Sequence, residues 1–345
     1  MRLAPDALSP AAPRMEDVAK LAGVALGTVS NVLNKPAQVS ERTRLKVNDA
    51  IRELGFVPNR TARALAAGSS NTIGFVVTDL SNSFFLDMTR GAEREAETVG
   101  MNVLLANVDM RPQKQQAHLD LFAEERVAGV LLAPLPGTAA AAAAEILPGR
   151  HIVMLNDALV DGVCTVSVDN ELGGYLAARH LIDLGKRRLA FAGDPTLAIP
   201  VRDRLAGVRR AVSEANGAVA LEVDHTPEVR IEQGREFGHL IALRAPEDRP
   251  DGIVAAADLL ALGILQAILS ESSLRVPDDI AITGYDNNRS AWDSLIPITT
   301  VAQPGEEMGA TAVRLLLAEV RDGVAHEHRH EVLEPALVPR ASTRG

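Results

Sequence analysis

The sequence predicts a small all-α helix-turn-helix domain followed by a two-lobed α/β domain with parallel sheets. Three observations lead to this fold class: three short helical patterns near the N-terminus, a regular alternation of apolar strands and amphipathic helices after residue 71, and the length of that second part. The chain has 345 residues, and a domain typically takes roughly 100–200, so two or three domains are expected. About 275 residues are too many for one α/β layer, which favours two lobes.

The composition is that of a globular protein. Apolar residues make up 47% of the chain and charged residues 23%, which excludes a largely disordered or fibrous protein. No apolar run reaches the roughly 18 residues of a membrane span, and the N-terminus lacks the apolar core of a secretory signal. Cys164 is the only cysteine, so we expect neither an internal disulfide nor a thiolate metal site, as in a cytoplasmic protein.

Charge is distributed unevenly along the chain. Residues 14–70 carry nine lysines and arginines against five acidic residues, although the whole chain has a formal net charge of −10. Residues 1–13 are neutral, so the body after residue 70 holds all of the excess acid. A small basic module joined to an acidic body is typical of a protein that binds a polyanion at one end. A chance cluster on a solvated helix surface is the alternative interpretation.

Three short helices are predicted in the basic module, after a Pro/Ala-rich N-terminus that we expect to be disordered. The first ends in a tight turn at Gly23, and the second, from about Leu26, ends at Lys35-Pro36 because proline cannot donate the next helical hydrogen bond. The third is capped by Ser40 and closed by Gly55, and a helix pair with a glycine turn has helix-turn-helix geometry. The side chains expected to face the core are Met15, Val18, Ala19 and Ala22, then Val29, Val32 and Leu33, then Leu45, Ala50, Ile51 and Leu54.

A possible hinge helix and a linker come before the alternating pattern. Pro58 interrupts the helices, residues 60–67 (RTARALAA) can form two helical turns, and residues 68–71 are typical of a linker. Strands and helices then alternate, and short apolar strands between amphipathic helices indicate parallel sheets covered on both faces. The strands are expected at 73–77, 103–106, 130–133, 152–155, 189–192, 253–256 and 280–283, and the helices at 85–99, 113–125, 170–184 and 261–270. Residues 139–144, six alanines, are expected to be helical.

The motifs of the chain resemble a known family. They are MEDVAKLAGVALGTVSNVLN at 15–34, VSERTRLKVNDAIRELGFVPNRTARALAAG at 39–68, and in the body TIGFVVTDLSNSFF, VAGVLLAP, VDNELGGYLAARHLIDLGKRRLAFAGDP, RLAGV, IAITGYDN and PALVPRAST. In content, order and spacing, residues 15–343 resemble the LacI/GalR family of bacterial transcription regulators. The resemblance implies a DNA-binding homodimer whose body is similar to a periplasmic sugar-binding protein and senses a small molecule.

The resemblance implies that residues 26–33 form the recognition helix, whose N-terminal end enters the major groove. Asn31 stands where many members have arginine, and because asparagine suits adenine and arginine suits guanine, the operator need not match the commonest half-site. Ala25 replaces the usual capping serine, a loss that typically costs about 1 kcal/mol. The implied base-reading residues are Leu26, Gly27 and Asn31, and the implied phosphate or base-edge contacts are Thr28, Ser30 and Asn34.

The hinge carries further implied DNA contacts. Leu65 lies where the family inserts a leucine through the minor groove, and an apolar wedge unstacks and bends DNA. Without the matching headpiece, Leu65 would be an ordinary linker leucine. Asn59 and Arg60 are implied contacts as well, Arg60 to the DNA backbone. Because an eight-residue helix is too short to persist alone, we expect the hinge to become ordered on DNA.

The body offers a ligand cleft at the carboxyl ends of parallel strands, between the lobes. An arginine and an aspartate that converge on hydroxyls give the directional hydrogen bonds of sugar recognition, so the expected effector is a carbohydrate. Alternatively, Arg204 and Asp286 form a salt bridge between the lobes. Ala257 stands where many sugar-responsive members have a polar residue, and Trp292 is a further candidate for stacking. The implied effector-binding residues are Asn82, Phe84, Phe85, Asn156, Arg204 and Asp286.

The expected domain boundaries follow from these assignments. Residues 1–13 form an N-terminal extension, 14–58 the DNA-binding domain, 59–71 the hinge and linker, and 72–345 the effector-binding domain. Within the last, the N-lobe is expected at 72–168 and 303–331 and the C-lobe at 169–302 and 332–345. No leucine heptad follows PRAST, so we expect a homodimer and not a tetramer.

Other chemistries find less support in the sequence. His326, His328 and His330 lie on one face of a predicted strand, where zinc could use them, but an exposed run is the simpler interpretation. GxGxxG, GxxxxGK[ST] and GxSxG are absent, so we expect no cofactor and no enzyme. The alternatives are a solute-binding protein without DNA function and an enzyme on an α/β scaffold. The expected partners are pseudo-palindromic operator DNA and a small molecule, with no membrane, and the expected location is the cytoplasm, at the nucleoid.

Overall fold

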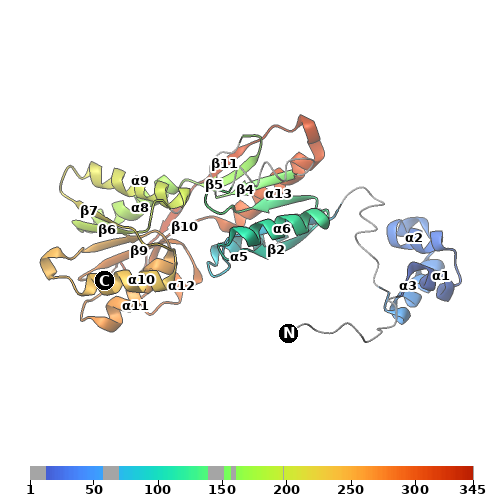
Figure 1. The fold of residues 1–345 in the computed structure, drawn as a ribbon, viewed down its shortest axis with the longest axis horizontal. Coiled ribbons are helices and arrows are strands. Elements are labelled where there is room, and N and C mark those ends of the chain that lie inside the picture. Colours follow the sequence, from blue (N-terminus) through green and yellow to red (C-terminus); the bar gives the residue numbers. More distant parts are fainter. Residues whose placement is uncertain (1–12, 57–69, 139–150, 157–160, 197, 345) are drawn as a thin grey trace. The chain divides into compact units, whose positions relative to one another are not determined.

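The computed structural model describes residues 13–56, 70–138, 151–156, 161–196 and 198–344 (Figure 1). It divides the chain into two compact units, Met1–Ser69 and Ser70–Gly345. The expected hinge helix at 60–67 and the alanine run at 139–144 lie outside the described residues. None of the helices in the described part of the chain combines the length and apolar character needed to cross a bilayer.

The first unit holds three helices around a small core. They are α1 (Met15–Ala22), α2 (Leu26–Asn34) and α3 (Glu41–Leu54), with a 3₁₀ turn, η1 (Pro36–Gln38), between the last two. Gly23 ends α1 at φ 65°, a left-handed conformation that glycine adopts without strain, and the turn leads directly into α2. The buried side chains are Val18, Ala19, Val29, Val32, Val47, Ala50 and Phe56.

One expected core residue of this unit is wrong. Leu45 is 52% exposed, whereas Val47, Ala50, Ile51 and Leu54 of the same helix are buried or pack against the core. At 3.6 residues per turn, Leu45 lies about 200° around α3 from Val47, so the two side chains leave the helix on opposite sides. Val47 shares a face of α3 with Ala50, Ile51 and Leu54 and is buried in the core where Leu45 was expected.

The second unit contains two six-stranded sheets. The first sheet has the order β11-β5-β4-β3-β1-β2, and every neighbouring pair in it is parallel. Helices α5 and α13 share one core cluster with the strands, and α6 shares another. The elements are β1 (Thr72–Val77), α5 (Phe84–Thr98), β2 (Asn102–Asn107), α6 (Pro112–Glu124), β3 (Gly129–Leu132), β4 (His151–Leu155), β5 (Cys164–Val168), α13 (Gly305–Asp322), η3 (Gly323–Ala325) and β11 (His330–Leu333).

The second sheet has the order β12-β10-β9-β8-β6-β7 and is parallel except for the pair formed by β10 and β12. Its strands are β6 (Arg188–Ala192), β7 (Ala220–Asp224), β8 (Gly252–Ala255), β9 (Ala281–Asp286), β10 (Thr299–Ala302) and β12 (Ala336–Val338). Its helices are α8 (Asn170–Asp183), α9 (Ile199–Glu214), α10 (Ile231–Ala242), η2 (Pro246–Asp248), α11 (Asp258–Glu271) and α12 (Arg289–Trp292). Helix α11 therefore begins three residues before the expected start at residue 261.

The chain passes between the two sheets three times, from β5 to α8, from β10 to α13 and from β11 to β12. We call the first sheet with its helices the N-lobe and the second sheet with its helices the C-lobe. Strand β11 ends at Leu333, two residues beyond the expected end of the N-lobe at residue 331, because the ladder with β5 continues to Val168.

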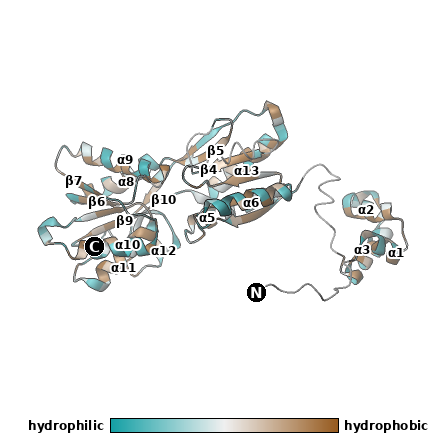
Figure 2. Cartoon of the chain, in the orientation of Figure 1, coloured by the Kyte–Doolittle hydropathy of each residue, from teal (hydrophilic) through white to brown (hydrophobic). Residues whose placement is uncertain are grey.

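The inner strands β1, β3, β4, β6 and β8 carry no polar side chain after their first residue, whereas β5, β9 and β10 also contain threonine, serine or aspartate (Figure 2 colours the chain by hydropathy). Between α8 and α9, glycines permit an unusually close approach. A Cβ on Gly174 would collide with the backbone of Arg204, and one on Gly207 with the backbone of Glu171. Any larger residue at these two positions would push α8 and α9 apart. The close packing of the two helices therefore determines where Arg204 lies relative to β9.

Candidate functional site

The exposed side of α2 carries the expected DNA-reading residues. Leu26 is 46% exposed, and Gly27, Asn31 and Asn34 are also exposed, whereas Val29 and Val32 on the opposite side are buried. Thr28 and Ser30 are half-buried, and the Asn34 side-chain amide donates to Ser30 Oγ at 3.2 Å. Within two turns, the helix therefore exposes an apolar side chain (Leu26), a glycine (Gly27) and a side-chain amide (Asn31) to solvent.

The start of α2 lacks a side-chain cap, as the sequence predicts. Ala25 occupies the N-cap position with extended backbone angles and accepts no capping bond through its side chain. A Cβ added to Gly27 would meet nothing within 4 Å, so packing does not require glycine there. The expected hinge contacts Asn59, Arg60 and Leu65 lie outside the described residues.

A cavity of about 550 Å³ lies between the lobes, where strands of both sheets end. Three of the six expected effector residues line it, namely Asn82, Phe85 and Asn156. Further lining residues follow the carboxyl ends of β1, β2, β3, β6 and β7 or start α9 and α11. Those that sequence reasoning missed include Thr78, Asp79, Met110, Pro134, Pro136, Thr196, Ile199, Arg202, Glu228, Arg230 and Leu259.

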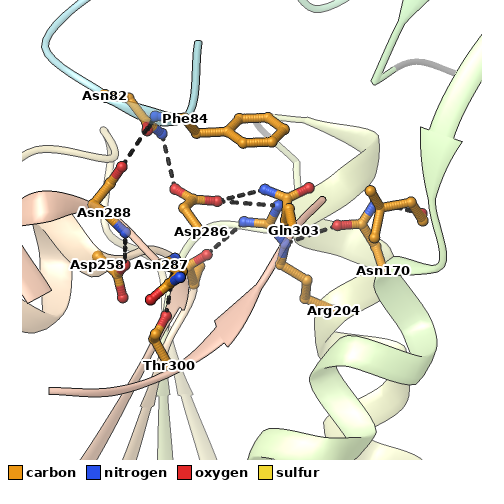
Figure 3. A network of polar contacts seen from close by, with 12 residues as sticks. Asn82, Phe84, Asn170, Arg204, Asp258, Asp286, Asn287, Asn288, Thr300 and Gln303 are labelled. Atoms are coloured by element: carbon orange, nitrogen blue, oxygen red, sulfur yellow. Dashed lines mark hydrogen bonds and ion pairs between the residues drawn. The ribbon is translucent and has the colours of Figure 1, made fainter. Parts of the chain in front are cut away.

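The other three expected residues lie outside the cavity wall. Phe84 is 2% exposed and packs in the N-lobe core against Phe85. Arg204 and Asp286 are both buried, and an Arg204 Nη2 lies 3.8 Å from Asp286 Oδ1 (Figure 3). Both belong to the C-lobe, on α9 and β9, so the alternative of a salt bridge between lobes is wrong: the ion pair lies within one lobe.

Arg204 is held on several sides. Its guanidinium carbon lies 3.6 Å from the centre of the Tyr285 ring, Nε donates to Asn170 Oδ1 at 2.9 Å, and Nη1 donates to the carbonyl of Ala256 at 2.6 Å. Stacking and charge-assisted hydrogen bonds of this kind fix a guanidinium in one orientation. The arginine is therefore a rigid part of the C-lobe.

Asp286 connects this C-lobe group to the N-lobe. Asn82 Nδ2 donates to Asp286 Oδ2 at 2.8 Å, and Gln303 Nε2 donates to Asp286 Oδ1 at 2.6 Å. Close by, Ser83 Oγ donates to Asn288 Oδ1 at 2.7 Å. We call Asn82, Ser83, Asp286 and Asn288 the interlobe cluster (Figure 3 shows all but Ser83 labelled). Since Asn82 also lines the cavity, the cavity and the contact between the lobes share a side chain.

Burial shapes the electrostatics beneath the cavity. It raises the pKa of Asp286, against the opposing effects of the Arg204 charge and of the Asn82 and Gln303 hydrogen bonds. Asp258 is fully buried, and desolvation together with the charge of Asp286 raises its pKa well above the ordinary value. Burial also raises the pKa of Tyr285 to about 12. Two carboxyls and an arginine therefore lie together away from water, where each charge depends on its neighbours.

Two expected effector residues have left-handed or strained backbones. Asn156 has φ 59° and Asp286 has φ 106°, conformations that cost free energy in residues other than glycine and concentrate at functional sites. Asn156 Oδ1 is also buried without a hydrogen-bond partner among the described residues. A buried acceptor without a partner in a cavity wall is suited to a ligand that donates a hydrogen bond.

The remaining candidates for stacking or metal binding lie elsewhere. Trp292 is half exposed, is absent from the cavity wall and donates from Nε1 to Asn287 Oδ1 at 2.8 Å. Ala257 is buried at the start of α11. Within the described residues, the group of three side chains close enough to share a metal ion lies around Cys164, not in the cavity.

Comparisons with known proteins agree with both parts of the chain. Residues 14–59 match the family model for bacterial regulatory proteins of the lacI family, and residues 178–343 match a periplasmic binding protein-like domain. The ribose operon repressor of Escherichia coli (strain K12) is 35% identical over 332 residues, which cover 95% of this chain and 99% of the relative. The HTH-type transcriptional repressor PurR of Mannheimia succiniciproducens is 33% identical over 335 residues, covering 96% and 98%.

A solved structure gives the same result. The complex of the transcriptional regulator CelR with cellobiose is 31% identical, covers 96% of this chain and 99% of that chain, and has a TM-score of 0.69. The expected fold class, a helix-turn-helix domain followed by a two-lobed α/β domain, is thereby confirmed. With relatives above 30% identity along nearly its whole length, this chain belongs to the lacI family of bacterial regulatory proteins.

Proposed function

We propose that this chain is a transcriptional repressor that binds operator DNA through α2 and whose affinity for DNA depends on a small molecule in the interlobe cavity. The observation that carries the proposal is the exposed end of α2, with Leu26 and Asn31 presented on a basic module. A basic module supplies the sequence-independent attraction to phosphates, and the helix supplies the contacts to base edges. The repressor names of the relatives support the same function.

The exposed residues of α2 suit particular base edges. Asn31 can form two hydrogen bonds with adenine, and Leu26 is suited to contact with a thymine methyl group. Gly27 leaves room for the DNA to approach. Thr28, Ser30 and Asn34 are proposed contacts to phosphates or base edges, and Asn59 and Arg60 are proposed contacts from the hinge, with Leu65 as the minor-groove wedge.

We propose a homodimer, because two DNA-binding domains related by a twofold axis match a pseudo-palindromic operator. The surface of the N-lobe supports this. Strand β2 is the edge of the first sheet and exposes Leu104 and Leu105, and Leu86 of α5 and Val99 directly after it are exposed as well. An exposed apolar edge is a surface that a second copy of the chain can cover.

The cavity favours a carbohydrate over a flat heterocycle as the effector. Among its described lining residues, Phe85 is the single aromatic one, so a flat ring would find no second aromatic face to stack against. The polar lining residues, including Asn82, Asn156 and Thr196, suit hydroxyl groups, and Asn156 Oδ1 offers a free acceptor. The ribose and cellobiose in the names of two similar proteins point to the same class.

Arg204 and Asp286 act in this proposal through the interlobe cluster. A ligand that hydrogen-bonds Asn82 competes with, or reinforces, the bond from Asn82 to Asp286 and thereby changes the contact between the lobes. Arg204 keeps Asp286 in place. Neither catalysis nor a cofactor is part of the proposed function, and the protein acts in the cytoplasm at the chromosome.

The DNA part is tested by binding of the full chain to the DNA upstream of its own gene, measured by fluorescence anisotropy at several salt concentrations. We expect Asn31→Ala to reduce the free energy of operator binding by about 1–3 kcal/mol per contact. It should also weaken the preference for one base over the others at one base pair in each half-site. The control is Asn216→Ala, the same change on an exposed turn of the C-lobe, away from α2 and from the edge strand β2. Equal effects of both variants, or none of either, would show that α2 does not read the operator.

The effector part is tested by a thermal-shift panel of pentoses, hexoses, phosphosugars and nucleosides. We expect a sugar to raise the melting temperature, and Asn156→Gly to weaken this effect because an acceptor in the cavity is lost. Asn216→Gly is the matched control, since Asn216 also has a positive φ, 50°, but lies on an exposed turn. A shift by nucleosides alone would identify a heterocycle and overturn the carbohydrate assignment.

A further inference from the structure

A second group of polar side chains lies at the outer side of the N-lobe sheet, apart from the cavity. Cys164 begins β5 and is fully buried, while His326 and His328 belong to the segment between η3 and β11. Cys164 Sγ lies 3.2 Å from His326 Nε2 and 3.8 Å from His328 Nδ1. All three ligand atoms lie within 4.8 Å of one another.

These distances agree with a shared metal ion. Zinc bonds of about 2.3 Å to sulfur and about 2.05 Å to nitrogen, at tetrahedral angles, place sulfur and nitrogen about 3.6 Å apart. The two observed distances, 3.2 and 3.8 Å, lie on either side of that value. The third pair, the two histidine nitrogens, lies within 4.8 Å, and tetrahedral zinc would bring these atoms to about 3.4 Å from each other.

Neighbouring groups orient the possible ligands. Asp322 Oδ2 lies 3.9 Å from His326 Nδ1, which is beyond hydrogen-bond distance. If the imidazole moves towards it, the carboxylate holds the proton on that nitrogen and leaves the other nitrogen free to bind a metal. The backbone N–H of Arg329 donates to Cys164 Sγ at 3.3 Å. A single thiol proton can serve only one of the two imidazoles that face the sulfur, whereas a cation serves all three ligands at once.

His330 does not belong to this group. Its Nδ1 lies 3.0 Å from Thr165 Oγ1, and the residue is the first of β11. The expectation that His326, His328 and His330 share one face of a strand is therefore wrong, because only His330 lies in the strand. The sequence-based expectation of no thiolate site rested on the number of cysteines alone. It took no account of His326 and His328, which the segment before β11 places next to Cys164.

We propose that Cys164, His326 and His328 form a Zn²⁺ site, in which a thiolate and two imidazoles hold the ion and a water molecule or an outside ligand takes the fourth position. His326 is 5% exposed in its side chain, whereas His328 is exposed, so the ion is reached from the side of His328. Bound zinc links the segment before β11 to β5 and thus fastens the outermost strand of the N-lobe.

The test is zinc binding by the full-length chain, free of any histidine tag and reduced with a phosphine. Competition with a chromogenic chelator measures affinity and stoichiometry, and Co²⁺ reports a thiolate ligand through its sulfur-to-metal charge-transfer absorption. We expect one ion per chain, with the charge-transfer band present. We expect Cys164→Ser and His328→Ala each to weaken binding by more than the roughly 10–100-fold that loss of an outer partner costs, since each removes a ligand.

Two further variants separate a site from an accidental cluster. Asp322→Asn keeps all three ligands and should weaken binding about 10–100-fold, as loss of a partner that orients a ligand does. His330→Ala removes a histidine of the same tract and should leave zinc affinity unchanged. Because His328 is exposed, its alanine variant stays folded even if Cys164→Ser does not.

The proposal is overturned if the wild-type chain binds no zinc, or if His328→Ala binds it as tightly as the wild type. It is also overturned if His330→Ala loses zinc to the same extent as His328→Ala, because the exposed histidine tract would then bind the ion without the thiolate. These outcomes concern the N-lobe edge alone and leave the proposed repressor function to its own tests.

Discussion

Asp258 is a buried carboxyl whose protonation affects the stability of the C-lobe. Desolvation and the nearby charge of Asp286 raise its pKa in the folded chain well above the ordinary value of 3.8. A raised folded-state pKa gives a contribution to stability that is complete below the ordinary value and is lost as pH rises through the folded-state pKa.

We therefore expect Asp258→Asn, which cannot ionise, to gain stability relative to the wild type as pH rises above about 4. The difference should level off once the folded-state pKa is passed. Asparagine retains an oxygen that can accept the N–H of Asn288, the bond that Asp258 accepts at 2.6 Å. Urea unfolding of both chains at stepped pH measures the effect, and a difference independent of pH would contradict a raised pKa for Asp258.

Asp286 is expected to matter for folding as well as for the effector response. It accepts hydrogen bonds from Asn82 and Gln303 and faces Arg204, all within a buried network. Removing one partner of a buried ion pair typically costs 3–5 kcal/mol, about the cost expected for Asp286→Ala, because Arg204 keeps a buried charge. Asn82→Ala removes the hydrogen bond to Asp286 and the bond that Asn82 Oδ1 accepts from the N–H of Phe84, and should cost about 2 kcal/mol.

Denaturant unfolding of the two variants compares these costs. If Asp286→Ala proves no more destabilising than Asn82→Ala, Asp286 is not a structural anchor of the network. The alanine variant of Asp286 is then the direct probe of ligand contact that the family resemblance suggests.

Half of the candidate effector residues could be placed in the cavity from sequence motifs. Asn156 directly follows β4, Asn82 lies in the loop from β1 to α5, and Phe85 lies in the first turn of α5; the carboxyl ends of parallel strands meet at a cleft. The same rule, applied to every strand end, would also have found Thr78, Asp79 and Thr196. Arg204 is buried, outside the cavity wall, because of the way α8 and α9 pack together. Asp286 has its strained backbone at the turn that follows β9. No sequence pattern predicts either feature.

At the scale of single elements, the start of α2 is open to improvement. Ala25 offers no side-chain acceptor, and the N–H of Thr28 donates to the Ala25 carbonyl at 2.8 Å, so a side-chain cap here would serve the N–H of Gly27, the second residue of the helix. We expect Ala25→Ser to stabilise α2 by about 1 kcal/mol, because its hydroxyl can accept that N–H.

Amide hydrogen exchange of the full chain measures this gain, as about fivefold slower exchange in α2. Exchange in α3 before its last turn serves as the reference within the same molecule, since Ser40 already caps that helix. Unchanged exchange in α2 would mean that the missing N-cap does not limit the stability of this helix.

The elements themselves were largely predictable from apolar periodicity. Every expected strand and helix in the described part of the body is present within a few residues. The strands that the pattern did not single out are the edge strands β7, β11 and β12 and the inner strands β5 and β10, whose sequences CTVSV and TTVA mix threonine or serine with apolar residues. An edge strand buries only part of its side chains, so its sequence lacks the continuous apolar run of an inner strand.

At the scale of the whole molecule, three chain segments connect the N-lobe to the C-lobe. We expect the two lobes to have two relative arrangements, between which these connections allow movement. The interlobe cluster joins loops more than 200 residues apart in sequence, and such long-range contacts cannot be read from local patterns. A ligand changes the balance between two lobe arrangements only by the difference in its affinity for them. By linkage, any effect of the ligand on DNA binding equals the effect of DNA on ligand binding.

The most direct test of this coupling is a pair of titrations on the full-length chain. Operator affinity is measured with and without the sugar identified by the thermal-shift panel, and sugar affinity is measured with and without saturating operator. We expect the two ratios to be equal, in the range of about 5–150-fold, and Asn156→Gly to weaken sugar binding while operator affinity without sugar stays at the wild-type value. Sugar affinity that is the same with and without operator would contradict a coupled repressor.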